Sequence, residues 1–165
     1  MPRPSSPAAA EAVAAEAVLP LRLFRPDNNL VALGLTVNYL MAKPAFANLH
    51  FGEWSRILIG QINRQHYCFV MDARDRIHGF VGWALATSEK AEAWIADRGE
   101  LRFEDSRSGD CVIVNAWAAD SAAVNRFMID QMRRMARDKT AAYFKRYYAD
   151  GRKRAVRLPL SGIGA

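Results

Sequence analysis

The sequence predicts one layered α/β domain, with a central, mostly antiparallel sheet of five strands flanked by helices. Segments with apolar residues at helical spacing occur among short β-rich runs. Polar turns containing Asp or Gly separate neighbouring strands, as in antiparallel hairpins. The chain has 165 residues, 51% of them hydrophobic, which suits a single domain whose core needs no disulfide or metal.

Each expected element has its own local signal. Helices begin at Asp, Asn, Ser or Thr and keep apolar residues three or four positions apart, whereas strands are short apolar runs. The unbroken apolar run at 111–118 predicts a strand covered on both faces. In chain order we expect helices over 30–41 and 53–62, strands over 66–73 and 77–86, a helix over 88–95, a strand over 111–118, a helix over 121–137, and strands over 140–148 and 153–160.

Residues 1–24 form an Ala-rich lead that we expect to be flexible or loosely helical, ahead of a single domain at 25–165. Two glutamates interrupt the apolar stretch that a signal peptide would need. No apolar run approaches the roughly 18 residues needed to cross a bilayer. Cys68 and Cys111 lie in apolar runs without CxxC spacing or a metal-like pairing with a histidine, so we expect buried thiols and no metal site. These features predict a cytoplasmic protein.

The basic charge is concentrated near the C-terminus. The chain has a net charge of +6, but residues 126–157 alone carry eleven Lys and Arg against three Asp. Such a face is either a solvated surface or a docking site for an acidic partner. Aromatic residues also lie among these cations, but alternating aromatics in a strand are more often half-buried core, so we do not expect nucleic acid. The candidate docking residues are Arg133, Arg134, Arg137, Lys145, Arg146, Arg152, Lys153 and Arg154.

Common catalytic motifs are absent from the sequence. It contains no GxGxxG, GxxxxGK[ST], HExxH or GxSxG pattern. The helix expected at 121–137 opens without glycine, which argues against coenzyme A binding through a Gly-rich loop. His66 and His78 lie in predicted strands, where we expect structural or exposed roles. His50 lies in a predicted loop between two helices, where functional residues are more frequent.

Several residues occur in the order and spacing of one family. They are Leu33-Gly34, Pro44, Trp54 four residues after a histidine, Tyr67 opening a strand, Trp83-Ala84, and Ser108-Gly109-Asp110 before a buried strand. From about Leu33 to Asp120 the chain resembles the toxin-activating lysine acyltransferases, relatives of the hemolysin-activating protein. The resemblance implies a fold similar to the acetyltransferase superfamily. It also implies transfer of a fatty acyl group from acyl-acyl carrier protein to a lysine of a repeats-in-toxin protein, with no permanently bound cofactor.

The family's essential histidine and aspartate both fall on altered positions. A gap-free count from Pro44 places Phe46 at the histidine position, and anchoring on the following tryptophan brings His50 close to it. The aspartate position falls on Asn115, or on Ala116 when no residue is deleted. The resemblance therefore suggests His50 as the base, with Asn115 orienting it or supporting the oxyanion.

Two functions remain open at this point. The first is a divergent acyltransferase that uses His50 and Asn115. The second is a non-catalytic descendant that keeps the fold and the docking surface as a binding or regulatory module. The basic face suits both, because acyl carrier protein is strongly acidic. Expected partners are acyl carrier protein and a repeats-in-toxin protein, and a homodimer is left open.

Overall fold

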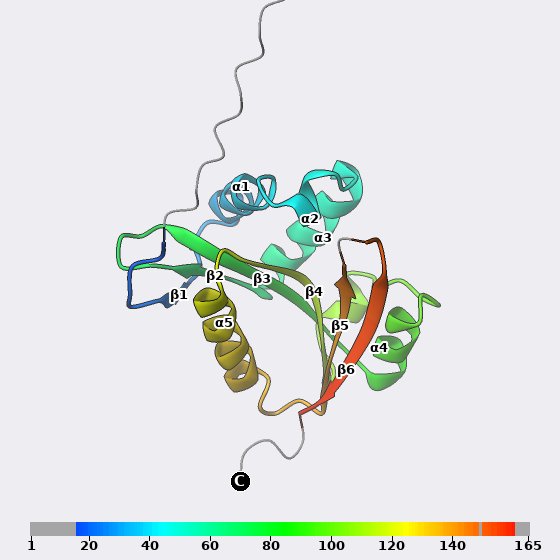
Figure 1. The fold of residues 1–165 in the computed structure, drawn as a ribbon. Helices are drawn as coiled ribbons and strands as arrows, with labels where there is room; N and C mark the ends of the chain where they lie inside the picture. Colours follow the sequence, from blue (N-terminus) through cyan, green and yellow to red (C-terminus); the bar gives the residue numbers. More distant parts are fainter. Residues whose placement is uncertain (1–15, 149, 161–165) are drawn as a thin grey trace, which may run out of the picture.

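A computed structural model describes residues 16–148 and 150–160 (Figure 1). Its six strands form one sheet in chain order, and only β4 and β5 run parallel, joined through α5 as a crossover helix. The strands are β1 (Arg22–Phe24), β2 (Tyr67–Met71), β3 (Ile77–Ala86), β4 (Cys111–Ala119), β5 (Ala141–Tyr147) and β6 (Lys153–Pro159). The helices are α1 (Asn29–Leu40), α2 (Pro44–Ala47), α3 (Phe51–Asn63), α4 (Ser88–Ile95) and α5 (Ala122–Met135), with a 3-10 turn at Glu104–Ser106.

The predicted α/β class is confirmed, with six strands rather than the five expected. The additional strand, β1, lies in the segment expected to be a flexible or loosely helical lead and pairs with β2 over three residues. A strand this short has no periodic signal of its own, so its partner decides its conformation. The single turn α2 was also not predicted. Residues 1–15 of the lead lie outside the described residues.

The helices begin at the capping residues that the sequence indicates. Asn28 accepts hydrogen bonds from the N–H groups of the first turn of α1. Thr87 does the same for α4, and Ser121 for α5. These side chains satisfy backbone donors that have no partner within the helix, so the local sequence sets where each helix starts.

Helices cover both faces of the sheet (Figure 1). On one face, α1 and α3 pack against an aromatic cluster that includes Tyr67, Phe69 and Phe80, and α4 packs farther along β3 and β4. On the other face, α5 packs through Val124 and Met128. Because side chains alternate along a strand, each strand of the sheet centre contributes to both layers of core.

The parallel strands β4 and β5 separate partway along their length. They pair only from Cys111 to Val114 of β4, although β4 continues to Ala119 and stays paired with β3. A bulge opposite Gly82 adds Asn115 to β4 at the point of separation. Beyond this bulge, one edge of β4 has no strand partner within the described residues, and its backbone groups are open to a ligand.

The two cysteines are buried free thiols, as expected, and burial raises the pKa of Cys68 above its ordinary value. None of the described helices combines the length and apolar character needed to cross a membrane. Over residues 16–148 and 150–160, no group of His, Cys, Asp and Glu is arranged to hold a metal ion.

Candidate functional site

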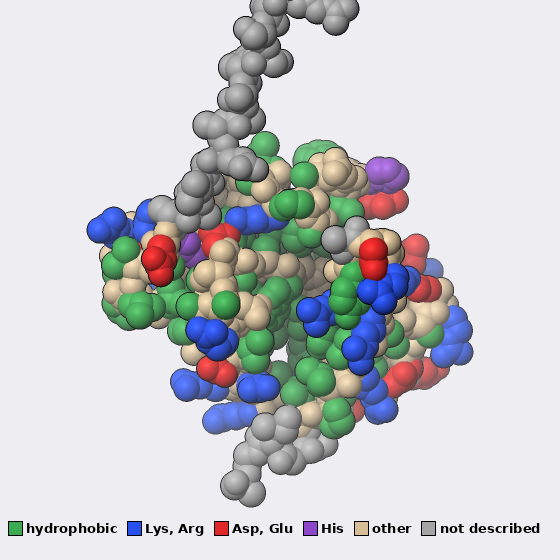
Figure 2. Space-filling model, in the orientation of Figure 1, with side chains coloured by type: hydrophobic (Ala, Val, Ile, Leu, Met, Phe, Trp, Pro, Cys, Tyr) green, Lys and Arg blue, Asp and Glu red, His purple; other side chains and the backbone are tan. Residues whose placement is uncertain are grey.

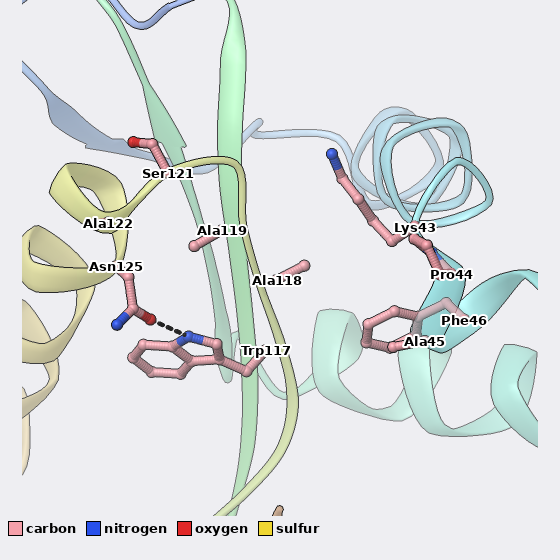
Figure 3. Close-up of a pocket in the computed structure, with 10 residues that line it drawn as sticks. All are labelled: Lys43, Pro44, Ala45, Phe46, Trp117, Ala118, Ala119, Ser121, Ala122 and Asn125. Atoms are coloured by element: carbon pink, nitrogen blue, oxygen red, sulfur yellow. Dashed lines mark hydrogen bonds between the residues drawn. The ribbon is translucent and has the colours of Figure 1, made fainter. Parts of the chain in front are cut away.

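A cavity of about 510 Å³ lies along the free edge of β4 (Figure 3). Trp117 and Phe46 stand on opposite sides of the strand, so the cavity extends around its edge. The indole Nε1 of Trp117 donates to Oδ1 of Asn125 at 2.9 Å, which fixes the ring. The walls come from α2 and the segment before it, the end of β4 and the start of α5: Lys43, Pro44, Ala45, Phe46, Trp117, Ala118, Ala119, Ser121, Ala122 and Asn125.

Backbone groups of β4 face this open edge. The N–H of Asp120 donates to the carbonyl of His78 at 2.9 Å. Hydrogen bonding alternates along an antiparallel pair, so Trp117 and Ala119 direct their N–H and C=O groups away from β3. An extended ligand with amide groups can therefore add to this edge as another strand would.

A chain of buried and partly buried titratable side chains lies behind the cavity wall. Lys43 forms an ion pair with Asp120, and Oδ1 of Asp120 also accepts from the Tyr39 hydroxyl at 2.9 Å. The other carboxylate oxygen of Asp120 is 3.3 Å from Nδ1 of His78, whose Nε2 is 3.1 Å from Oδ2 of Asp72. His78, expected to be structural or exposed, is buried and joins two carboxylates.

Two groups of this chain have strongly shifted pKa values. Burial by itself would raise the pKa of Asp72, but hydrogen bonds from the backbone and side chain of Arg76 and from other backbone N–H groups hold it well below its usual range. Burial raises the pKa of Tyr39 far above its ordinary value, and the charge and hydrogen bond of Asp120 raise it further. Asp72 therefore stays a carboxylate, and Tyr39 stays a neutral donor.

The structure does not bring His50 and Asn115 together. His50 lies at the start of α3 with its side chain 85% exposed, and its Nδ1 is 3.9 Å from Oε2 of Glu53. Asn115 instead accepts a 2.5 Å hydrogen bond from Nε2 of Gln61 near the end of α3. A helix rises about 1.5 Å per residue, so the eleven residues from His50 to Gln61 place the two predicted site residues about 16 Å apart along α3. Asn115 thus orients Gln61, not His50.

The Gln61–Asn115 amide pair occupies the bulge where β4 leaves β5. Gln61 is fully buried, and a Cβ at Gly82 would lie 2.1 Å from its Oε1, so a larger residue there would displace the Gln61 amide. Oε1 of Gln61 has no hydrogen-bond partner among the described residues. A buried acceptor without a partner is costly to the stability of the fold.

The predicted basic face occupies two separate elements. Arg133 and Arg134 lie in the last turn of α5 and Arg137 follows it, whereas Lys145, Arg146, Arg152, Lys153 and Arg154 lie on the β5–β6 hairpin. Figure 2 shows basic side chains gathered around the lower end of α5 and along β6, with a hollow between the two groups. A partner that contacts both groups would have to cover this hollow.

The cations of the hairpin are divided between its two faces. Lys145 and Lys153 lie on the α4 side, where both bind Asp97 and hold its pKa at about 2. Arg146 and Arg154 are directly opposite each other in the two strands, on the α5 side. Neither forms an ion pair within the part of the chain that the structure describes. Like charges opposed across a strand pair are destabilising, so this pair favours a bound anion.

Between the two basic groups, the sheet presents apolar side chains to the hollow. The strand register aligns them in two rows across β4, β5 and β6. Val112, Ala142 and Leu158 form one row, and Val114, Phe144 and Val156 form the other. The β4 members of both rows pack with the core beneath α5, which places the rows on the α5 face.

Comparison with known protein families shows to which family the chain belongs. The RTX toxin acyltransferase family, HlyC, matches residues 25–158, which include α1 to α5 and all but the first strand and the last residue of the sixth. The chain belongs to the RTX toxin acyltransferase family. This confirms the resemblance inferred from the sequence, and it supports an acyltransferase as the general class of protein.

The solved structures similar to this chain include the loading GNATL domain of CurA from Lyngbya majuscula, with a TM-score of 0.48 and 10% sequence identity. The match covers 78% of this chain and 66% of that one, so this chain spans slightly less than two thirds of the matched structure. A comparison with curated proteins finds no match.

The two residues that a gap-free count from the sequence sets at the family's histidine and aspartate positions lie in one apolar cluster. Phe46 and Ala116 both belong to the cluster beneath α1 and α3. The Phe46 ring packs edge-on against Trp54, with ring centroids 5.1 Å apart. Neither side chain can transfer a proton.

His66 is the third histidine and lies outside the cavity. It immediately precedes β2, and its ring stacks on Trp83 with centroids 5.9 Å apart. Burial lowers the pKa of His66 to about 4, and the nearby charges of Arg64, Arg25 and Lys139 also lower it. His66 is therefore neutral near pH 7 and resists protonation in the folded state.

Acidification from pH 7 to pH 5 should lower the stability of the protein through His66. In the unfolded chain a histidine takes up its proton near pH 6.5, but folded His66 does so only near pH 4. The unfolded state then binds more protons, and we expect a loss on the order of 1 kcal/mol after allowing for partial exposure of the ring. Urea unfolding at pH 7 and pH 5 measures this loss of stability. His66→Gln should flatten the dependence, and an unchanged dependence in this variant would contradict the assignment.

Proposed function

We propose that this chain is a protein acyltransferase that moves a fatty acyl group from acyl-acyl carrier protein to a lysine of a repeats-in-toxin protein. Membership of the RTX toxin acyltransferase family over residues 25–158 carries the proposal. In the reaction, the lysine amine attacks the thioester carbonyl and a C–N bond forms. The C–S bond then breaks, and the carrier leaves as a thiol with the proton that the amine loses.

The free edge of β4 and its cavity support this function. The outward backbone groups of Trp117 and Ala119 suit the amides of a phosphopantetheine arm, which would extend along the strand edge. The cavity walls are mostly apolar and suit the acyl chain. The Gln61–Asn115 pair lies at the bulge where this free edge begins.

His50 as base and Asn115 as oxyanion support stay predictions for the chemical step. His50 lies at the start of α3 and Asn115 contacts Gln61 near its end, so the two residues can act only separately in this arrangement. His50→Ala and Asn115→Ala test them one at a time, with labelled acyl-acyl carrier protein and a lysine-bearing protein substrate. Loss of transfer with intact folding supports each assignment, and undiminished transfer removes it.

The second candidate function is a non-catalytic module that binds the same partners. The apolar residues Phe46 and Ala116 at the two family positions favour it. The two candidates differ in one assay with the purified protein and labelled acyl-acyl carrier protein. Transfer of label to a substrate lysine supports the enzyme, whereas saturable association without transfer supports the module.

Docking of acyl carrier protein should depend on one face of the hairpin. We expect Arg146→Gln with Arg154→Gln to weaken its association about tenfold in low salt, because these arginines lack acidic partners in the described structure. The matched control is Arg152→Gln with Lys153→Gln, which removes the same charge from side chains already paired with Asp150 and Asp97.

The control pair should change the affinity for acyl carrier protein by less than about threefold. Titration by fluorescence anisotropy at two salt concentrations measures both pairs, since exposed charges lose their effect as salt rises. Equal weakening by the two pairs would mean that only net charge matters. In that case Arg146 and Arg154 do not form a docking site.

A further inference from the structure

Lys43 is the one charged side chain among the ten residues that line the β4-edge cavity. It lies beside Phe46 and extends toward the end of β4 (Figure 3). Its Nζ is 4.3 Å from the centroid of the Tyr39 ring and forms an ion pair with Asp120. The side chain is 25% exposed, so it is held in the wall of the cavity and does not move freely in solvent.

The ammonium group of Lys43 has hydrogen-bonding capacity to spare. An ammonium carries three N–H donors. Within the described residues Nζ donates to one acceptor, Oδ1 of Asp120. At least one donor is therefore available to a ligand in a cavity whose walls are otherwise mostly apolar. In such surroundings a charged donor acts more strongly on an oxygen than it does in water.

A row of side-chain contacts behind the cavity wall holds Lys43 in place. The His78 ring bridges the two carboxylates, with Nδ1 3.3 Å from Oδ2 of Asp120 and Nε2 3.1 Å from Oδ2 of Asp72. Arg76 then donates to Asp72 at 2.8 Å. These contacts run without a break from Arg76, which is partly exposed, to Lys43 in the wall of the cavity.

We propose that Lys43 binds the carbonyl oxygen of the acyl group in the cavity, and that Asp120 and His78 position it. This inference rests on the proposed acyl transfer for the thioester, but the carboxylate of a free fatty acid offers the same kind of oxygen. As the substrate amine attacks and the C–S bond breaks, negative charge develops on that oxygen. Lys43 keeps its proton and stabilises the charge by donating a hydrogen bond.

Binding of decanoate, a ten-carbon carboxylate, tests the inference without any need for catalysis. Isothermal titration should show binding to the wild type, at least tenfold weaker binding to Lys43→Met, and binding to Lys43→Arg within about threefold of the wild type. The control, Lys90→Met, removes a cation that pairs with Asp105 away from the cavity and should leave the affinity unchanged. Equal binding by the wild type and Lys43→Met, or no binding by the wild type, would overturn the inference.

A double-mutant cycle separates positioning from simple structural support. Tyr39→Phe removes one donor to Asp120 and should weaken decanoate binding two- to fivefold. In the Lys43→Met background the same change should have no further effect, because Tyr39 acts through Lys43. Additive effects in the double variant would exclude a positioning role.

The outcomes also separate this inference from the proposed function. Decanoate binding that depends on Lys43, in a protein that transfers no acyl group, would support the inference and exclude the proposed catalytic function. Acyl transfer by a Lys43→Met variant with the kcat and KM of the wild type would exclude a role for Lys43 in the reaction and would still support the proposed acyltransferase function. If Lys43 stabilises developing charge, kcat should fall at least tenfold with little change in KM.

Discussion

Replacing Gly109 with alanine should lower the free energy of unfolding by about 3 kcal/mol or more. Gly109 has a φ of +144°, in a region that residues with a Cβ rarely adopt. A Cβ there would lie 2.1 Å from the carbonyl carbon and oxygen of Ala86 and 2.7 Å from the nitrogen of Thr87. These are backbone atoms between β3 and α4, so no side-chain rotation can relieve the contact.

Gly34→Ala is the matched control for Gly109→Ala. Gly34 lies within α1, and no atom would lie within 4 Å of an added Cβ. Alanine is the better helix former, so this variant should be neutral or gain up to about 1 kcal/mol. Urea unfolding of both variants measures the difference. If the free energy of unfolding of Gly109→Ala were within 1 kcal/mol of the wild-type value, the backbone conformation at Gly109 before β4 would differ from the one described.

Asp120→Ala should also destabilise the fold strongly, by about 3 kcal/mol. Asp120 is the common acceptor for Lys43, Tyr39 and His78, and its side chain is only 11% exposed. Its removal leaves the partly buried Lys43 ammonium, the buried His78 ring and the Tyr39 hydroxyl without their partner. Breaking a buried ion pair from one side costs more than the pair contributes, because the remaining charge is uncompensated.

Asp130→Ala serves as the control for Asp120→Ala. The Asp130–Arg133 pair lies on the outer side of α5, with both side chains more than half exposed and 4.0 Å between the charged atoms. Its loss should cost less than about 0.5 kcal/mol. Thermal unfolding measures the loss of stability in both variants. The loss in Asp120→Asn, which keeps one acceptor oxygen, should lie between those of Asp120→Ala and Asp130→Ala. Equal effects of Asp120→Ala and Asp130→Ala would mean that the buried charges are solvated in solution.

Local signals were sufficient to predict most of the fold. Capping residues, helical spacing and the Asp-Gly turn act within a few positions of each other, so the expected helices and strands appear close to their predicted bounds. The prediction missed β1 and α2. Strand β1 has three residues and depends on hydrogen bonds to β2. Helix α2 is a single turn after Pro44, too short for a periodic pattern.

The candidate site was harder to predict, because its residues are far apart in the sequence. Tyr39 and Asp120 are 81 positions apart, and no pattern joins them. His78 looked like an ordinary strand histidine, and only the turn of Asp72 and the end of β4 supply its two carboxylates. His50 looked better placed in its loop, but the length of α3 carries it away from Asn115.

By itself, the sequence determined the family, the order of the elements and the concentration of basic charge near the C-terminus, because each depends on residue type and short-range spacing. Only the tertiary structure decided which of those charges stay available to a partner. Asp97 lies 48 residues before Lys145 and 56 before Lys153, and folding places it against both. Arg146 and Arg154 point to the other face, the α5 side of the sheet, because side chains alternate along each strand.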